Sequence, residues 1–557
     1  MNAEKFNPKQ KGLYFIPLGG SEQFGVNLNV YTCDGDVLAI DCGIGFADER
    51  HPGIDLLLPD PQFLEDHQDR LKGMIITHAH EDHIGAVAHL YNRLECPLYA
   101  TKFTATVLRL KLDERGHKKV KINIIDDMAE FKIGHFICKA VPVAHSIPDS
   151  ISVFLQTTYG NVLHSGDWNL DPDPVVGSQT NADHFKALGK QGVLAYIGDS
   201  TNSEYDKRAG SEGIVAHGLA EEMKQCNGKV AVTIFSSNIA RIHSIAEASK
   251  DCGREVAVIG RSLHRMIGAA KTCGLLNDVN FIPEEDIGYL PDDKVTLIMT
   301  GSQGEYRAAL ARVSRGEHNV KLKPGDTVIF SARAIPGNER EISTVKNNLS
   351  CAGIHTITPK DSKHTIHVSG HPYQDEISQM YHWVKPMTVI PVHGEHTQLE
   401  AQAAFAKDCQ VENTVIPQNG AVIQIAPGTP EIIDHVKTGL LAVDQKRIIK
   451  IDHQSIIARR KLQYSGTIHV SLVVDNKGNL LGDPKMDTVG LIDPSFEEEL
   501  EFEDTIYNEI LDILDDMSGK ERLDDHFISE EIRIGLRRYV FHMLKIKPKT
   551  TVHVIRV

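Results

Sequence analysis

The stretch at residues 74–83, Met-Ile-Ile-Thr-His-Ala-His-Glu-Asp-His, constrains this chain more than any other. Its first residues are apolar or β-branched and predict a buried strand, and the polar residues after them predict a loop at the end of that strand. His78, His80, Asp82 and His83 lie in that loop. A turn aims neighbouring side chains in different directions, so this spacing can serve two metal positions, and imidazole is the commonest protein ligand of zinc-like metals. The pattern therefore predicts a metal centre rather than a surface cluster of polar residues.

Other parts of the chain offer ligands in the same setting. His145, Asp167 and His393 each come shortly after an apolar run that predicts a strand. Any one of them alone would more simply be a polar loop residue. A centre with two metal ions needs more ligands than one loop holds, so together with the 74–83 stretch they become candidate ligands. His393 lies far downstream, and its participation would make the intervening block an insertion.

The pattern of the chain changes along its length. Up to about residue 208, short β-rich runs alternate with turns, which predicts stacked sheets that deliver ligands at strand ends. Helical and strand-like segments then alternate, which predicts a separate parallel α/β sheet. We expect a first domain at 1–208, an inserted domain at 209–360, a return to the first domain at 361–430, a linker at 431–464 and a C-terminal α+β domain at 465–557.

Composition narrows the possible functions. A net charge of −16 over 557 residues argues against a protein that coats nucleic acid by charge alone, although a local basic channel could still bind a polyanion. No run approaches the roughly 18 apolar residues that a membrane span needs, so no membrane partner is expected. The chain starts without a signal-peptide pattern, and its nine cysteines include no C-x-x-C pair. These features favour a cytoplasmic protein with reduced thiols.

Several short motifs, spread along the chain, form a specific combination. They are Thr77 to His83, Ile40-Asp41-Cys-Gly, His145, Ser165-Gly-Asp167, Asp199-Ser-Thr-Asn202, His367-Val-Ser-Gly-His371 and Pro391-Val-His-Gly394. Together they resemble the motifs of the metallo-β-lactamase superfamily with a β-CASP insertion, and within it the bacterial ribonuclease J family. The resemblance covers essentially the whole chain. It implies an α/β fold: a metallo-β-lactamase αββα sandwich with an inserted parallel α/β β-CASP domain and a small C-terminal α+β domain.

The resemblance also implies two divalent metal ions per subunit, Zn²⁺ or Mn²⁺. One ion would be bound by His78, His80, His145 and Asp167, and the other by Asp82, His83, Asp167 and His393, with Asp167 as the bridge. Two such ions can hold a hydroxide nucleophile at neutral pH and neutralise the charge of a phosphate under attack. Asp41 would accept the second N–H of a ligand imidazole. A plain turn residue before Gly43 is the alternative for Asp41.

Further residues follow from the same resemblance. His371 would give a proton or a hydrogen bond to the leaving 3′ oxygen, with Asp199 setting its tautomer, so that His371, Asp199, Asp82 and Asp41 are the expected catalytic residues. The expected substrate-binding residues are Ser236, Ser237 and Asn238, which precede a helix whose N-terminus suits a phosphate, and His367, Val368, Ser369, Gly370 and His371. Candidates to line a groove between the domains are Arg241, Arg261, Arg265, Lys360 and Lys363.

The resemblance implies a metal-dependent ribonuclease with 5′-to-3′ exonuclease activity, a preference for 5′-monophosphate RNA and endonuclease capacity, acting in rRNA processing and mRNA decay. Its expected partners are single-stranded RNA, further copies of itself through the C-terminal domain as a homodimer or homotetramer, and an RNA-degradation complex. The alternating strand at 551–557 suits such pairing. The alternatives are a non-catalytic or weakly active RNA-decay scaffold, a β-CASP nuclease acting on DNA, and a small-molecule hydrolase. The complete ligand set disfavours the scaffold, His393 disfavours the DNA nuclease, and the inserted block disfavours the small-molecule hydrolase.

Overall fold

The computed structural model describes residues 6–335, 337–493, 495 and 497–557, without the side chains of 497–501 and 503. The chain forms two compact units. The first contains the chain up to Gly45 and Leu57–Leu440, and the second contains Phe46–Leu56 and Leu441–Val557. In the described part of the chain, no helix has both the length and the apolar character that crossing a membrane requires.

Two large sheets form the base of the first unit. Their strand orders are β22-β21-β1-β2-β3-β6-β7-β8 and β20-β19-β13-β12-β11-β10-β9. The eight-stranded sheet consists of β1 (Leu13–Gly19), β2 (Leu28–Cys33), β3 (Asp36–Ile40), β6 (Leu71–Ile76), β7 (Leu98–Ala100), β8 (Ile122–Ile124), β21 (Ala421–Ala426) and β22 (Glu431–His435). The seven-stranded sheet consists of β9 (Glu130–Ile133), β10 (Phe136–Pro142), β11 (Ile151–Thr157), β12 (Gly160–His164), β13 (Ala195–Asp199), β19 (Thr388–Val392) and β20 (Asn413–Thr414).

The main core lies between these two sheets. Phe15 and Tyr31 of the eight-stranded sheet are buried in one cluster with Val153 and Ile197 of the seven-stranded sheet. These side chains alternate with residues that face outward, because successive residues of a strand point to opposite faces. Burying both apolar faces against each other leaves the outer faces to be covered by helices.

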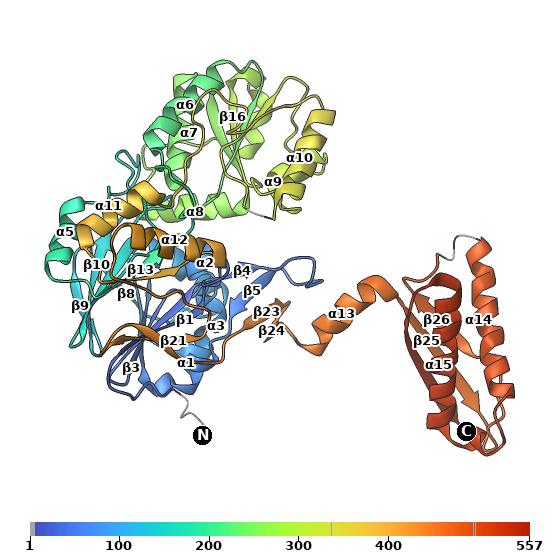
Figure 1. Ribbon diagram of the computed structural model, residues 1–557. Coiled ribbons are helices and arrows are strands. Elements are labelled where there is room, and N and C mark those ends of the chain that lie inside the picture. Colours follow the sequence, from blue (N-terminus) through green and yellow to red (C-terminus); the bar gives the residue numbers. More distant parts are fainter. Residues whose placement is uncertain (1–5, 336, 494, 496) are drawn as a thin grey trace. The chain divides into compact units, whose positions relative to one another are not determined.

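Helices cover those outer faces. On the seven-stranded sheet, α5 (Ala182–Lys190), α11 (Gln374–Val384) and α12 (His396–Asp408) contribute Phe185, Met380 and Ala406 to one buried cluster. On the eight-stranded sheet, α4 (Lys102–Glu114) contacts β7 and β8, and α3 (Val87–Leu94) lies against α4 and against α1 (Gln62–Asp66). The predicted αββα sandwich is confirmed (Figure 1).

A separate sheet is inserted between β13 and β19, which are parallel neighbours with Asp199 opposite Val392. Its order is β15-β16-β14-β17-β18, and all neighbours are parallel. Every residue of β14, β16 and β17 is buried, as expected for a parallel sheet that is covered on both faces. The predicted parallel α/β insertion is confirmed, and Figure 1 shows it in green and yellow. Its elements are α6 (Glu212–Lys224), β14 (Val230–Thr233), α7 (Ile239–Asp251), β15 (Glu255–Ile259), α8 (Arg261–Thr272), β16 (Val295–Met299), α9 (Ala309–Ser314), β17 (Thr327–Phe330), α10 (Glu339–Cys351) and β18 (His355–Ile357).

The segment 431–464, for which we expect a linker, contains regular structure. Its first element, β22, pairs with β21 and so extends the eight-stranded sheet. Next come β23 (Leu440–Asp444) and β24 (Arg447–Lys450), which form an antiparallel hairpin, and helix α13 (Gln454–Ser465). The apolar run Ile432-Ile433 of β22 is the signal that would have predicted this strand.

The end of the chain forms the predicted α+β fold. Its sheet has the order β26-β25-β27, with β25 (Thr467–Val474) antiparallel to β26 (Lys485–Val489) and parallel to β27 (Lys549–Arg556). Two helices, α14 (Glu497–Asp515) and α15 (Asp525–Leu544), pack together. Ile468 of β25 and Ile532 of α15 are fully buried in one cluster, which gives this part of the chain a core of its own.

Candidate active site

The 74–83 stretch forms the end of β6 and the short helix α2 (Glu81–Ile84). The loop after β3 packs directly against it: the Cys42 N–H donates to the carbonyl of His83 at 2.7 Å. Gly43 lies between these contacts, and a Cβ atom there would be 1.5 Å from the carbonyl oxygen of Asp82. Only glycine permits this approach, so the Ile-Asp-Cys-Gly motif fixes the backbone of the histidine loop.

Asp41 holds the histidine loop through its carboxylate. It accepts the Thr77 N–H at 2.8 Å and the Nδ1–H of His83 at 2.8 Å. Asp41 adopts a φ of 63°, a left-handed conformation that few residues other than glycine tolerate as well as Asp and Asn. Because a carboxylate only accepts, the proton of His83 is on Nδ1, and the lone pair of Nε2 points away from Asp41.

Four of the predicted metal ligands form one group: His78, His80, His145 and Asp167, whose ligand atoms all lie within 4.8 Å of one another. Nδ1 of His80 is 3.1 Å from Nε2 of His78 and 3.0 Å from Nε2 of His145. Nδ1 of His145 donates to the carbonyl of Gly370 at 2.7 Å, so its Nε2 carries a lone pair. Three imidazole nitrogens thus converge on one point.

Asp82, His83, Asp167 and His393 form a second group with the same spacing, and Asp167 belongs to both. Nε2 of His393 lies 3.1 Å from Oδ2 of Asp82 and 3.3 Å from Nε2 of His83. Nε2 of His83 lies 3.2 Å from Oδ2 of Asp167. Like Asp41, His393 has a left-handed φ, of 57°. Such backbone conformations cluster at functional sites, where the surrounding structure enforces them.

The chemistry of these two groups fits divalent cations. Burial lowers the pKa of His80 to about 4 and that of His145 to about 3, so both offer lone pairs at neutral pH. Burial alone would raise the pKa of Asp167, but His393 and His83 hold it well below its usual range. Close, buried lone pairs and carboxylates repel one another unless a cation lies among them. Nitrogen and oxygen donors of this kind suit Zn²⁺ or Mn²⁺.

His371 and Asp199 lie beside these groups. Nδ1 of His371 donates to Oδ2 of Asp199 at 2.8 Å and is 3.8 Å from Oδ2 of Asp167. Burial disfavours the charged imidazole, but the carboxylates of Asp199 and Asp167 raise the pKa of His371 above its usual value. Asp167, Asp199, His371 and His393 also satisfy the spacing of a ligand group, so this pair is within reach of the same centre.

The 367–371 segment, His-Val-Ser-Gly-His, lies against the metal-ligand groups. A Cβ at Gly370 would be 2.9 Å from Cε1 of His145, so glycine lets the segment approach this ligand. Ser369 accepts a hydrogen bond from Nδ2 of Asn202 at 2.9 Å. Val368 packs on Gly210, where a Cβ atom would be 2.4 Å from its Cγ1. His367 lies 3.4 Å from a guanidinium nitrogen of Arg241.

The Ser236-Ser237-Asn238 motif begins helix α7. Asn238 is the N-cap, and its side chain accepts the N–H of Arg241 at 2.8 Å. Its amide lies 3.4 Å from the carboxylate of Glu212. The side chain of Asn238 is therefore engaged within the inserted domain, whereas Ser236 and Ser237 are partly exposed.

The structure contradicts the expectation for Arg241 and shows one further contact that the sequence does not predict. Arg241 does not line a groove: it is fully buried in an ion pair with Glu212. Arg265 pairs with Glu114. Thr201 was overlooked, although its hydroxyl lies 2.9 Å from Nδ1 of His393. Its position in Asp-Ser-Thr-Asn, two residues after Asp199, is the signal that could have identified it.

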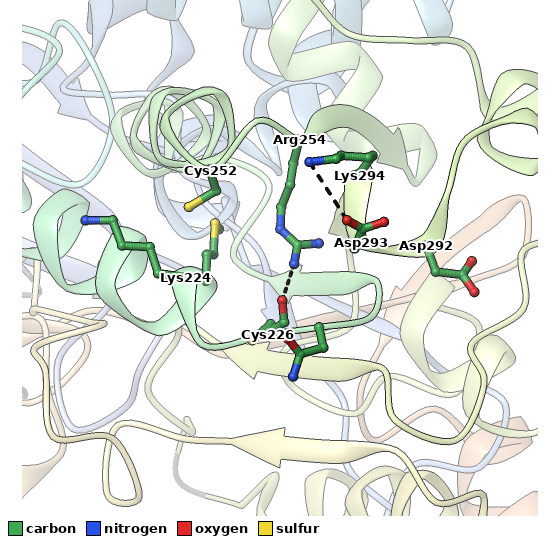
Figure 2. Close-up of a pocket in the computed structure, with 9 residues that line it drawn as sticks. Lys224, Cys226, Cys252, Arg254, Asp292, Asp293 and Lys294 are labelled. Atoms are coloured by element: carbon green, nitrogen blue, oxygen red, sulfur yellow. Dashed lines mark hydrogen bonds and ion pairs between the residues drawn. The ribbon is translucent and has the colours of Figure 1, made fainter.

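A cavity of about 480 Å³ lies in the inserted domain, and its lining differs from that of the candidate active site. Figure 2 shows Arg254 and Lys294 among its lining residues, and none of the predicted site residues is there. Nη1 of Arg254 donates to the carbonyl of Gly228 at 2.8 Å, and Nζ of Lys294 lies 3.8 Å from Asp293. Its cations are thus already engaged, and none of the ligand groups found among the described residues lies in it.

Comparison with known families covers most of the chain. Residues 37–185 match the beta-lactamase superfamily domain, and 227–349 match the beta-CASP domain of ribonuclease J. Residues 360–417 match the Zn-dependent metallo-hydrolase RNA specificity domain, and 455–557 match the ribonuclease J C-terminal domain. The metallo-hydrolase match and the buried His/Asp groups together indicate metal binding.

Two curated relatives are similar to this chain over nearly their whole length. Ribonuclease J of Sinorhizobium meliloti is 40% identical over 98% of this chain and 97% of its own. Ribonuclease J of Mycolicibacterium smegmatis is 34% identical over 98% of each chain. A crystal structure of a protein of unknown function from Enterococcus faecalis V583 has a TM-score of 0.53 and 14% identity, covering 74% of this chain and all of that one. That last likeness concerns the fold alone.

Proposed function

Because this chain belongs to the ribonuclease J family and is a metal-dependent ribonuclease, we propose that it degrades single-stranded RNA from the 5′ end, prefers a 5′-monophosphate and can also cut internally. It acts in RNA maturation and decay in the cytoplasm. The observation that carries the proposal is the pair of buried ligand groups that share Asp167, with the His371–Asp199 pair beside them.

The two ligand groups would hold two divalent ions, Zn²⁺ or Mn²⁺. His78, His80, His145 and Asp167 would bind the first, and Asp82, His83, Asp167 and His393 would bind the second. When bound, such ions lower the pKa of water and neutralise charge on the phosphate under attack. Asp41 orients His83 through the 2.8 Å hydrogen bond to Nδ1, which keeps Nε2 directed at the metal position.

His371 donates a proton to the leaving group. Its Nδ1–H is bound to Asp199, so its Nε2 is the nitrogen that faces substrate. The carboxylates around it favour the protonated imidazole, which can donate a proton from Nε2 to the departing 3′ oxygen. Asp199 is fixed in turn, because its backbone carbonyl accepts from Nε2 of the buried Gln402 at 3.0 Å.

The substrate's phosphates are bound by the 367–371 segment and by the start of α7. Backbone N–H groups at a helix N-terminus favour an anion, and Ser236 and Ser237 are accessible there. In the 367–371 segment, the imidazole of His367 and the hydroxyl of Ser369 offer hydrogen-bond donors, and both side chains are partly exposed. A pocket that holds a terminal phosphate near the metals would count nucleotides from the 5′ end, which is the basis for exonucleolytic trimming.

The C-terminal domain mediates self-association as a homodimer or homotetramer, and the assembly joins an RNA-degradation complex. Support comes from β27, which lies at the edge of its sheet and exposes about half of Ile555. An edge strand with apolar residues is suited to pairing with another chain. Light scattering on the full chain, and on a chain that ends before Ser465, measures the contribution of this domain.

One experiment tests the proposed function. The chain is incubated with 5′-labelled RNA that carries a monophosphate or a triphosphate, and with DNA of the same sequence. The proposal predicts labelled mononucleotides from the monophosphorylated RNA, few from the triphosphorylated RNA, and none when a chelator is present. Absence of all products would support the scaffold alternative, and equal cleavage of DNA would support the DNA nuclease.

A further inference from the structure

Two guanidinium groups lie near His367, and they differ in what they can still bind. Arg241 is fully buried, and its Nε and Nη2 donate to the carboxylate of Glu212 at 2.9 and 2.6 Å. Its Nη1 donates to the carbonyl and the hydroxyl of Ser331 at 2.8 and 2.7 Å. Because these bonds occupy a guanidinium with no exposed surface, Arg241 cannot contact a substrate strand.

Arg333 is the other guanidinium, and its side chain is exposed. Its Nη1 donates to Oδ1 of Asn202 at 3.0 Å, and its central carbon lies 5.8 Å from the centre of the Tyr205 ring. No carboxylate among the described residues forms an ion pair with it. A guanidinium carries five N–H donors, so most of those of Arg333 remain available to an anion.

The backbone of Arg333 is held in place after β17. Gln303 is almost fully buried, and its Nε2 donates to the carbonyl of Arg333 at 2.9 Å. The same side chain also holds the residues that follow, because Oε1 of Gln303 accepts the N–H of Ile335 at 2.8 Å. A side chain that starts from a fixed backbone loses less conformational entropy when it binds.

Arg333 is next to the 367–371 segment. The same Asn202 that accepts from Arg333 donates from Nδ2 to the hydroxyl of Ser369 at 2.9 Å and to the carbonyl of His371 at 3.2 Å. The amide group of Asn202 therefore links the guanidinium of Arg333 to the proposed phosphate site in the 367–371 segment. Burial, followed by the charges of Arg241 and Arg333, holds the pKa of His367 well below its usual value, so His367 is neutral. The positive charge at this place comes from Arg333.

We propose that Arg333 binds a phosphate group of the RNA strand that lies on the 367–371 segment. The inference rests on the proposed ribonuclease function. Guanidinium–phosphate pairs form strong, directional hydrogen bonds, and a chain with a net charge of −16 needs local cations to hold a polyanion. Tyr205 and Asn202 position the guanidinium from the side of the first domain, so the contact joins both domains to the substrate.

The test compares Arg333→Ala and Arg333→Lys with Arg340→Ala, a change at an exposed arginine of α10. KM and kcat are measured on metal-loaded, full-length protein with one RNA sequence that carries a 5′-monophosphate or a 5′-hydroxyl. Arg333→Ala should raise KM roughly 10- to 100-fold and leave kcat within a few-fold, because a charge-assisted hydrogen bond is lost. Arg333→Lys should retain part of the affinity, and Arg340→Ala should behave as the wild type.

A second readout is the salt dependence of RNA affinity, measured by fluorescence anisotropy in chelator so that no cleavage occurs. Losing one phosphate contact should reduce the slope of log affinity against log salt by about 0.7. An effect confined to 5′-monophosphate RNA assigns Arg333 to the terminal phosphate, and an equal effect on both RNAs assigns it to an internal one. If Arg333→Ala matches Arg340→Ala in KM and slope, the inference is overturned. An inactive wild type would overturn the proposed function instead, while the affinity measurement still tests Arg333.

Discussion

The metal-ligand groups and the 367–371 segment are neighbours that are built in different ways. Five of the seven predicted ligand side chains are buried. Specific partners fix the second ring nitrogen of two of them: Asp41 binds His83, and the carbonyl of Gly370 binds His145. The 367–371 segment is only partly buried. Its contacts come from far along the chain, from Asn202 in the first domain and Arg241 in the inserted one.

The difference follows from what each region has to do. A site that holds small cations needs short, fixed distances, and burial with partner hydrogen bonds provides them. A site that admits a polymer has to stay accessible, and its precision comes from the elements that flank it. We therefore expect changes at the metal-ligand side chains to abolish hydrolysis, and changes at the residues that flank the 367–371 segment to alter binding or local stability. His371 is the exception within that segment, because its imidazole reaches the ligand groups.

The largest effect should come from Asp167→Asn. The carboxylate belongs to both ligand groups, so its loss removes one charged donor from each. Hydrolysis of 5′-monophosphorylated RNA should fall below detection, and the metal content per chain, measured by elemental analysis, should fall with it. The control is Asp183→Asn, at an exposed side chain of α5. If Asp167→Asn hydrolysed RNA at the wild-type rate, the proposal that Asp167 bridges a catalytic metal centre would be contradicted.

His371→Ala should lower kcat by a factor of about 10² to 10⁴, the usual contribution of a general acid. The metal content should stay at the wild-type level, because His371 is a proton donor in this account and not a ligand. His382→Ala, at an exposed residue of α11, is the matched control. A loss of metal together with activity would instead favour a ligand role, which the spacing of His371 to Asp167 and His393 permits.

Arg241→Met tests the support of the 367–371 segment. The change leaves the buried carboxylate of Glu212 without its partner, which should destabilise the protein by about 3–5 kcal/mol, measured by chemical denaturation. Adding Glu212→Gln should recover part of that loss, since the uncompensated charge disappears. A cost below about 1 kcal/mol for Arg241→Met would show that the pair does not stabilise this region.

Asp41→Asn should have the smallest effect, a loss of about 10- to 100-fold in metal affinity. Asparagine tolerates the left-handed backbone at this position, so the change reports on the charge that orients His83. Affinity is measured by competition with a chelator, beside the exposed control Asp69→Asn. Unchanged affinity would make Asp41 a turn residue only.

The sequence predicted the layered fold, and it singled out the His and Asp residues that the structure groups together, because both depend on local patterns. The apolar strand that ends at His78 and His80 can be recognised from its sequence alone. Apolar strand patterns also return near His393, and this return predicts that the block before them is an insertion. The sequence did not predict that Arg241 is buried, and it did not single out Arg333. Residue type alone does not distinguish an arginine that pairs with a buried carboxylate from one that pairs with no carboxylate. Only the placement of Glu212 against α7, a long-range contact, decides between them.

The central claim is that the buried His/Asp groups hold the metal on which RNA hydrolysis depends. The most direct test strips the wild-type chain with a chelator, and then measures hydrolysis of 5′-monophosphorylated RNA before and after Zn²⁺ or Mn²⁺ is restored. We predict no hydrolysis from the stripped chain and recovery on restoring metal, with no recovery in Asp167→Asn. Undiminished hydrolysis by a stripped chain that analysis shows to be free of metal would contradict the claim.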